Sequence, residues 1–148
     1  MKIPLKYGLM ITGCFIVWVV IAHALVSNPR SLVHSVGAGS FVNIIEILAI
    51  FLGIRAQQKA NAGELSFKEG LKTGVGIAFV YGLSACLFFL VEILLLGPKM
   101  LAGEPGAEAR PVWQAALMAF VGLFAGALLM GLLYSTIISF VFAARRRS

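Results

Sequence analysis

Five polar or ionisable side chains stand out within long apolar stretches of the sequence, where they could take part in proton or ion chemistry. They are His23, Asn43, Glu46, Tyr81 and Glu92. Carboxyl, imidazole and phenol groups exchange protons, and in a lipid bilayer such groups face the protein interior and find a partner. They indicate either a proton- or ion-coupled path through a membrane, or polar contacts that fix how helices pack.

The depth of these residues within their apolar stretches suggests two pairs. Glu92 and His23 lie at similar depth toward the outer ends of their stretches, and we expect them to pair. Glu46 lies near the centre of its stretch, with Asn43 or Tyr81 as its expected partner. Either carboxyl could instead be protonated, because burial away from water disfavours the charged form.

Metal and enzyme chemistry are not expected. His23, Glu46 and Glu92 are of metal-ligand types, but their spacing matches no established metal signature. The sequence has no Ser-His-Asp arrangement, no phosphate-binding glycine loop and no zinc-protease helix motif. We therefore expect no catalytic residue, no metal and no cofactor, with Cys14 and Cys86 as free, buried thiols.

The composition identifies the elements that must position these side chains. Of 148 residues, 60% are hydrophobic and 12% are charged, against about 25% charged residues in an ordinary soluble domain. The mean hydropathy is +0.97, and four apolar runs are each long enough for a helix to cross a bilayer, which takes about 20 residues. We predict one all-α domain over residues 1–148, a four-helix transmembrane bundle with helices at about residues 7–26, 36–61, 66–96 and 115–144.

Basic residues predict the orientation of this bundle. Nine of the 12 basic residues lie before the first run, between the second and third runs, or after the fourth. Because Lys and Arg near membrane spans stay on the cytoplasmic side, we expect both termini in the cytoplasm of a bacterium, with the chain in the inner membrane. The positive charge then contacts anionic lipid headgroups, and no nucleic acid is needed as a partner. The first run is longer than a signal-peptide core of about 7–15 residues, which favours an uncleaved helix.

A polar stretch joins the second and third runs, and we expect it to form a cytoplasmic helical hairpin. Its residues are Arg55, Lys59, Gly63, Ser66 and Glu69. Ser66 and Glu69 have the spacing of a capping box, which begins a helix. Gly63 suits the left-handed conformation that ends one. The hairpin either fixes orientation and turn geometry or forms a docking surface for another protein.

The same stretch carries a family resemblance. It contains an Ile-Arg pair at the end of an apolar helix, followed by Asn61, Gly63, Leu65, Ser66, Phe67 and Gly70. This pattern resembles a bacterial membrane family known as domain of unknown function 4199, over about Tyr7 to Pro98. The resemblance implies four membrane helices and supplies no assigned activity and no catalytic residue.

Small residues predict how the helices associate. Gly70 and Gly74 recur on one face of the third helix, and Gly122 and Gly126 on one face of the fourth. Close approach through small residues supplies the van der Waals contact that holds membrane helices together, so we expect these faces to point inward. We predict a subunit in the lipid bilayer that acts by helix association, in a homo-oligomer or a larger membrane complex. The alternative is a small proton- or ion-coupled transporter or channel subunit that uses the intramembrane carboxyls.

Overall fold

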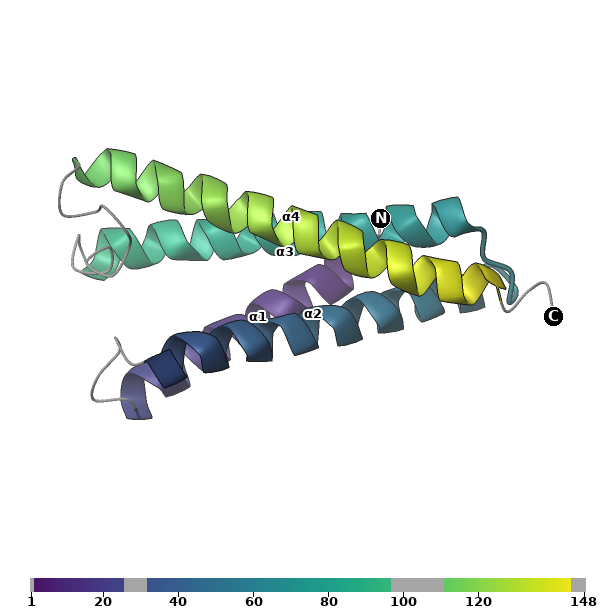
Figure 1. The fold of residues 1–148 in the computed structure, drawn as a ribbon, viewed down its shortest axis with the longest axis horizontal. Helices are drawn as coiled ribbons and strands as arrows, with labels where there is room; N and C mark the ends of the chain where they lie inside the picture. Colours follow the sequence, from purple (N-terminus) through teal and green to yellow (C-terminus); the bar gives the residue numbers. More distant parts are fainter. Residues whose placement is uncertain (1, 26–31, 97–110, 145–148) are drawn as a thin grey trace.

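The computed structural model describes residues 2–25, 32–96 and 111–144, with side chains described except at 22–25, 32–39 and 95–96. This part of the chain forms four helices (Figure 1). They are α1 (Lys2–Leu25), α2 (Leu32–Ala60), α3 (Phe67–Leu96) and α4 (Val112–Ala144). No strand occurs in the described ranges, so the prediction of an all-α fold is confirmed.

Each helix is long and apolar enough to cross a membrane. The candidate spans are Lys2–Ile21, Ser40–Ala60, Phe67–Leu94 and Val112–Ala144. This confirms the predicted four transmembrane helices. The helices α1 and α2 begin at Lys2 and Leu32, earlier than the expected residues 7 and 36, because an apolar run marks the part of a helix in lipid and not where its hydrogen bonding starts.

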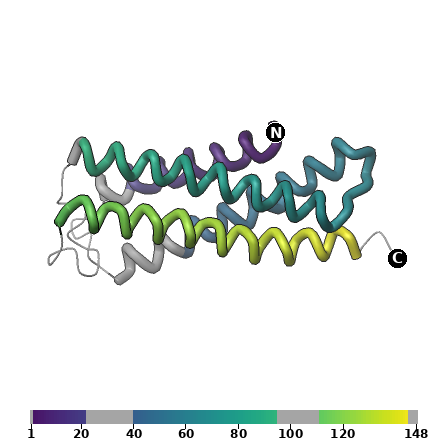
Figure 2. Tube along the Cα trace, turned by 90° about the horizontal axis from the view of Figure 1, so that it is seen from above, coloured from purple at the N-terminus to yellow at the C-terminus, as the bar shows by residue number. Residues whose placement is uncertain are grey.

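The central pair of the bundle is α2 and α3. Helix α1 packs against both of them, and α4 packs against both on its own side, with the most extensive interface between α3 and α4. The first turn of α1 and the last turn of α4 lie toward the end where α2 turns into α3 (Figure 2). Consecutive helices therefore cross the bundle in alternating directions.

The outside of the bundle is as apolar as its inside. Ile50, Ile54 and Ile77 are fully buried at the centre. Leu129 and Phe140 on α4 nevertheless each expose 67% of their surface. Large exposed side chains of this kind over all four helices are what a lipid environment accommodates and water does not. The protein therefore contacts the lipid bilayer.

The turn between α2 and α3 ends α2 through two residues with positive φ. Ala62 has φ 55° and Gly63 has φ 90°. The Gly63 amide donates to the Gln58 carbonyl at 2.9 Å, which is the six-to-one bond of a Schellman motif. In that motif the terminating left-handed residue is Ala62, one position earlier than the predicted Gly63. Gly63 has positive φ as expected, but it follows the terminator.

The predicted capping box begins α3. The Ser66 amide donates to Glu69 Oε2 at 2.9 Å, and the Glu69 amide donates to Ser66 Oγ at 3.3 Å. The Asn61 side chain donates to Glu69 Oε1 at 3.2 Å, so the same carboxylate also joins the end of α2 to the start of α3. The prediction of a capped helical hairpin is confirmed. Its location in the cytoplasm stays a prediction.

Candidate functional site

Helices α3 and α4 meet along a row of small residues that we call the α3–α4 seam. Its four contacts are Gly70 with Ser139, Gly74 with Ser135, Ala78 with Gly131, and Gly82 with Ala127. Each step of four residues along α3 is matched by a step of four backwards along α4, as antiparallel helices require. The α4 residues of this row are buried. The seam brings the two backbones close and sets the rotation of α4 about its axis.

The seam includes two of the four predicted packing glycines. Gly70 and Gly74 lie in it, but Gly122 and Gly126 are exposed, and a Cβ atom added at either would meet none of the described residues within 4 Å. The expectation that Gly122 and Gly126 point inward is therefore wrong. Helical residues are rotated by about 100° each, so Gly122 lies about half a turn away from Gly131.

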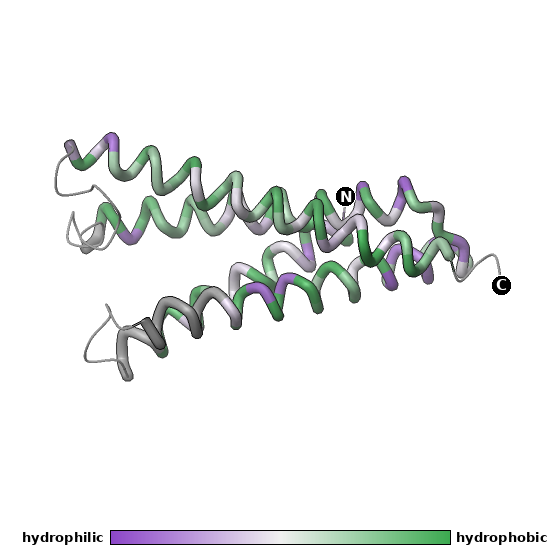
Figure 3. Tube along the Cα trace, viewed as in Figure 1, coloured by the Kyte–Doolittle hydropathy of each residue, from purple (hydrophilic) through white to green (hydrophobic). Residues whose placement is uncertain are grey.

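Glu46 lies at the middle of α2 and is directed at the seam. Only 2% of its surface is exposed. Its Oε1 atom lies 3.2 Å from the position that a Cβ atom on Gly131 would occupy. At this point the seam consists of Gly131 and Ala78. Because Gly131 has no side chain, the Glu46 carboxyl can lie directly against it. Figure 3 shows a hydrophilic segment partway along α2, within an otherwise largely apolar helix.

A hydrogen bond next to Glu46 connects α2 with α4. The Tyr134 hydroxyl donates to Asn43 Oδ1 at 2.9 Å. Asn43 precedes Glu46 by about one helical turn, and Tyr134 follows Gly131 by about one turn. This bond gives Asn43 a partner that the sequence analysis did not name. A tyrosine within a membrane helix needs a partner for its hydroxyl, so the residue type of Tyr134 was an available signal.

The predicted partners of Glu46 lie nearby, but neither forms a hydrogen bond with its buried Oε1 atom. Glu46 Oε1 has no hydrogen-bond partner among the residues that the structure describes. Tyr81 is 4% exposed and lies, like Tyr134, close enough to interact electrostatically with the Glu46 carboxyl. The structure thus gathers Asn43, Glu46, Tyr81 and Tyr134, from three helices, into one group that we call the polar junction.

The second predicted pair lies partly outside the described side chains. Glu92 is half-buried near the end of α3. The His23 backbone belongs to α1, but its side chain is not among those described. The pairing of Glu92 with His23 stays a prediction.

Hydroxyl groups make a further polar contact that the sequence analysis missed. Thr12 on α1 and Ser84 on α3 lie 2.6 Å apart, Oγ1 to Oγ. The Thr12 hydroxyl also lies 3.2 Å from the Gly8 carbonyl, and the Ser84 hydroxyl lies 2.7 Å from the Val80 carbonyl. Each hydroxyl has a single proton, so one of the two donates to the carbonyl of its own helix. The other donates across to its partner, and this bond joins α1 to α3.

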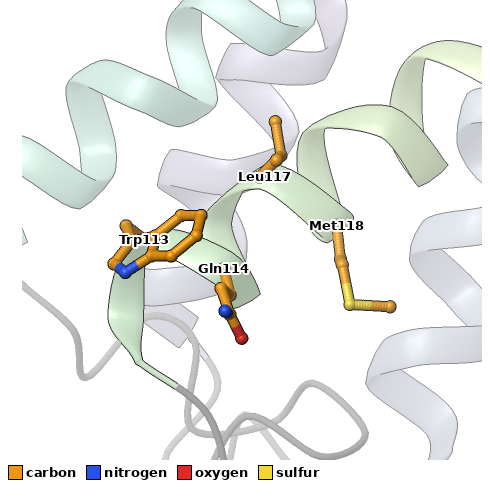
Figure 4. Close-up of a pocket in the computed structure, with 4 residues that line it drawn as sticks. All are labelled: Trp113, Gln114, Leu117 and Met118. Carbon is orange, nitrogen blue, oxygen red and sulfur yellow. The ribbon is translucent and has the colours of Figure 1, made fainter.

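A pocket lies at the start of α4, apart from the polar junction. It is lined by Trp113, Gln114, Leu117 and Met118, all from the first two turns of that helix (Figure 4). At about 1.5 Å per residue, Trp113 is about 27 Å along α4 from Gly131. Within the described ranges, no group of three or more His, Cys, Asp or Glu side chains is placed to hold a metal ion.

Fold and site together define a small multi-pass membrane protein with a polar junction between its helices. Residues 6–103 match the family model described as protein of unknown function (DUF4199), and the chain belongs to that family. The predicted resemblance is confirmed. No curated protein and no solved structure matches the chain. The matched residues include Asn43, Glu46 and Tyr81, whereas α4 with Tyr134 lies beyond them.

Proposed function

We propose that the protein is a membrane subunit that acts by helix association through α4, in a homo-oligomer or as an accessory subunit of a larger complex, without enzymatic activity. One observation carries this proposal. Gly122 and Gly126 lie four residues apart on the face of α4 opposite the seam, with open space around both. Small residues at this spacing let the backbone of a second helix approach closely.

The glycine pair supports this proposal more strongly than the apolar surface around it. Leu129 and Phe140 are also exposed on α4, but exposed apolar residues on a membrane helix imply only contact with lipid. Glycines reduce the contact that a helix makes with lipid and increase the contact that it can make with another helix. The proposal therefore assigns the association surface to Gly122 and Gly126.

We further propose that the protein lies in a bacterial inner membrane with both termini in the cytoplasm. Exposed basic residues gather at the ends of α2 and α3 that meet in the hairpin. They are Arg55, Lys59, Lys68 and Lys72. In a background without Cys14 and Cys86, a membrane-impermeant thiol reagent should label Ser31→Cys in intact cells and leave Ala62→Cys unlabelled. Labelling at position 62 alone would reverse the orientation.

The association surface can be tested by adding bulk to exposed glycines. Gly122→Leu and Gly126→Leu should shift the purified chain, in lipid nanodiscs or mild detergent, to a smaller assembly measured by native mass spectrometry. Gly13→Leu is the matched control, because Gly13 on α1 is also exposed with nothing within 4 Å of an added Cβ. If all three variants assemble like the wild type, or if the wild type is monomeric and copurifies with no other subunit, the proposal is wrong.

A second candidate function is proton- or ion-coupled transport, and one observation favours it. Glu46 is buried inside the bundle with one carboxyl oxygen unpartnered among the described residues. Replacing Glu46 with Gln removes the titratable proton while it keeps the size and the hydrogen-bonding capacity of the side chain. A folded and fully assembled Glu46→Gln variant with the phenotype of a deletion strain would favour transport over association alone.

A further inference from the structure

The association proposal makes no use of the carboxyl group at the centre of the bundle. Glu46 is 2% exposed at the middle of α2, and its Oε1 atom has no hydrogen-bond partner among the described residues. A buried carboxylate is stabilised only by a counter-charge, by hydrogen bonds or by a bound ligand. The question is which of these neutralises Glu46.

No basic side chain in the described ranges is placed to neutralise it. The basic residues there are Lys2, Lys6, Arg55, Lys59, Lys68 and Lys72, and all are exposed. They lie in the first turns of α1 or near the hairpin, whereas Glu46 lies at the middle of α2.

The titratable groups near Glu46 are hydroxyls, which carry no positive charge. Helix α3 contributes Tyr81, and α4 contributes Tyr134. From α1, Tyr7 lies against Gly53, about two turns farther along α2. None of these phenols can supply a counter-charge to a carboxylate.

Within the described ranges, no group of three or more His, Cys, Asp or Glu side chains is placed to hold a metal cation at Glu46. Gly131 lies against Glu46 Oε1 and packs on Ala78, so small apolar groups fill the space in front of it. Asn43 Oδ1, the amide oxygen one turn away, already accepts from Tyr134. Cations such as Mg²⁺ and Ca²⁺ take about six or more oxygen ligands. A proton needs no additional ligand and no additional volume.

We propose that Glu46 is a proton-binding site at the centre of the membrane domain and that it holds its proton at neutral pH. Binding adds one proton from water to one carboxylate oxygen and removes one negative charge from the bundle interior. Release returns the proton to water and leaves a buried charge facing Gly131. A buried charge without a partner is unfavourable, so proton release weakens the packing of Glu46 against the α3–α4 seam.

Infrared spectroscopy of the full chain in lipid bilayers tests this site directly. All six acidic residues of the sequence are glutamates, so ¹³C-labelled glutamate identifies every side-chain carboxyl absorption. At neutral pH the wild type should show the C=O absorption of a protonated carboxyl, and this absorption should fall as the pH is raised. Glu46→Gln should lack it, while Glu64→Gln, at an exposed position in the hairpin, should retain it.

Two results would overturn the proposal. One is the absence of a protonated-carboxyl absorption in the wild type at neutral pH, and the other is an unchanged absorption in folded Glu46→Gln. If Glu46→Gln does not fold, Glu92→Gln decides, because Glu92 is the half-buried glutamate of α3. Retention of the absorption in Glu92→Gln supports Glu46, and its loss contradicts the assignment. Since Gly122→Leu changes the opposite face of α4, it should leave the absorption intact even if it abolishes association.

Discussion

Helix α4 has two faces lined by small residues, and among the residues that the structure describes only one of these faces packs against another helix. Ser135 and Gly131 on the inner face lie against Gly74 and Ala78 of α3. Gly122 on the outer face has nothing within 4 Å of an added Cβ. The difference shows that small residues four apart do not determine a contact by themselves. A second helix must present its own small residues at the matching spacing.

The inner face also shows that serine acts as a small residue in this seam. Ser135 Oγ donates to the Gly131 carbonyl of its own helix, so the hydroxyl needs no partner on α3. Ser139 Oγ, by contrast, is buried and has no hydrogen-bond partner among the described residues. Shape therefore decides the packing at these two positions, and hydrogen bonding across the helices does not.

The largest expected effect is at the centre of the seam. Gly74→Ala places a methyl group against the Ser135 side chain, where an added Cβ has no room. Overpacking of this kind costs about 1–3 kcal/mol, and we expect that loss in the free energy of unfolding measured by reversible denaturation in detergent. The substitution should destabilise the chain even though alanine is the better helix former by about 1 kcal/mol in water.

A compensating substitution sharpens this test. Ser135→Gly removes the side chain that the new methyl group meets, so the double variant Gly74→Ala, Ser135→Gly should recover most of the lost stability. If the double variant is no more stable than Gly74→Ala alone, the packing of Gly74 against Ser135 does not set the distance between α3 and α4.

The sequence was sufficient for the fold because length and hydropathy alone predict membrane helices. It also identified Glu46 as an interior residue, since a carboxyl in an apolar helix has few other places to go. It predicted the wrong face of α4 as the inward one, the face of Gly122 and Gly126. That rotation is set by the match between α4 and the glycines of α3, and the Gly122 and Gly126 pair has the same spacing as the true contact row.

The partners at the polar junction were unpredictable for the same reason. The bond from Tyr134 to Asn43 depends on how far α4 is rotated and shifted along α2. Neither quantity is encoded in the hydrophobic pattern of a helix that is apolar on every side. At the hairpin, glycine preference pointed to Gly63 as the terminating residue, whereas the hydrogen bonding selects Ala62.

A substitution in the turn between α2 and α3 is expected to stabilise the protein. Ala62→Gly should increase the free energy of unfolding by about 1 kcal/mol or less. Relief of the left-handed conformation at φ 55° is worth about 1–2 kcal/mol, and the greater freedom of glycine in the unfolded chain offsets about 0.4–1 kcal/mol of that gain. The same denaturation measurement applies. Gly63→Ala is the control, since Gly63 has φ 90° and should lose stability. A lower stability of Ala62→Gly than of the wild type would show that the turn is not strained.

A smaller loss of stability is expected when only the contact of α4 with α2 is weakened and its contact with α3 is left intact. Tyr134→Phe removes the hydroxyl that donates to Asn43 and leaves the neighbouring Ser135 in the seam. Interhelical hydrogen bonds in membranes average about 0.6 kcal/mol, so we expect a loss of that order in the free energy of unfolding. A double-mutant cycle with Asn43→Leu measures the pair itself. A coupling several times larger would mean that the polar contact holds α4 more firmly than the seam does.

The smallest expected effect on stability is on the outer face of α4. The substitution there is again glycine to alanine, as at Gly74. Gly122→Ala adds one methyl group to open space, so the free energy of unfolding of the monomer in detergent should stay within about 0.5 kcal/mol of the wild type. Comparison with Gly74→Ala cancels the difference in intrinsic helix preference, because both positions are helical. What remains is the difference between a methyl group against Ser135 and a methyl group facing lipid. If Gly122→Ala destabilises the monomer as much as Gly74→Ala does, both faces of α4 are packed within one chain, and the outer face is unavailable to a partner.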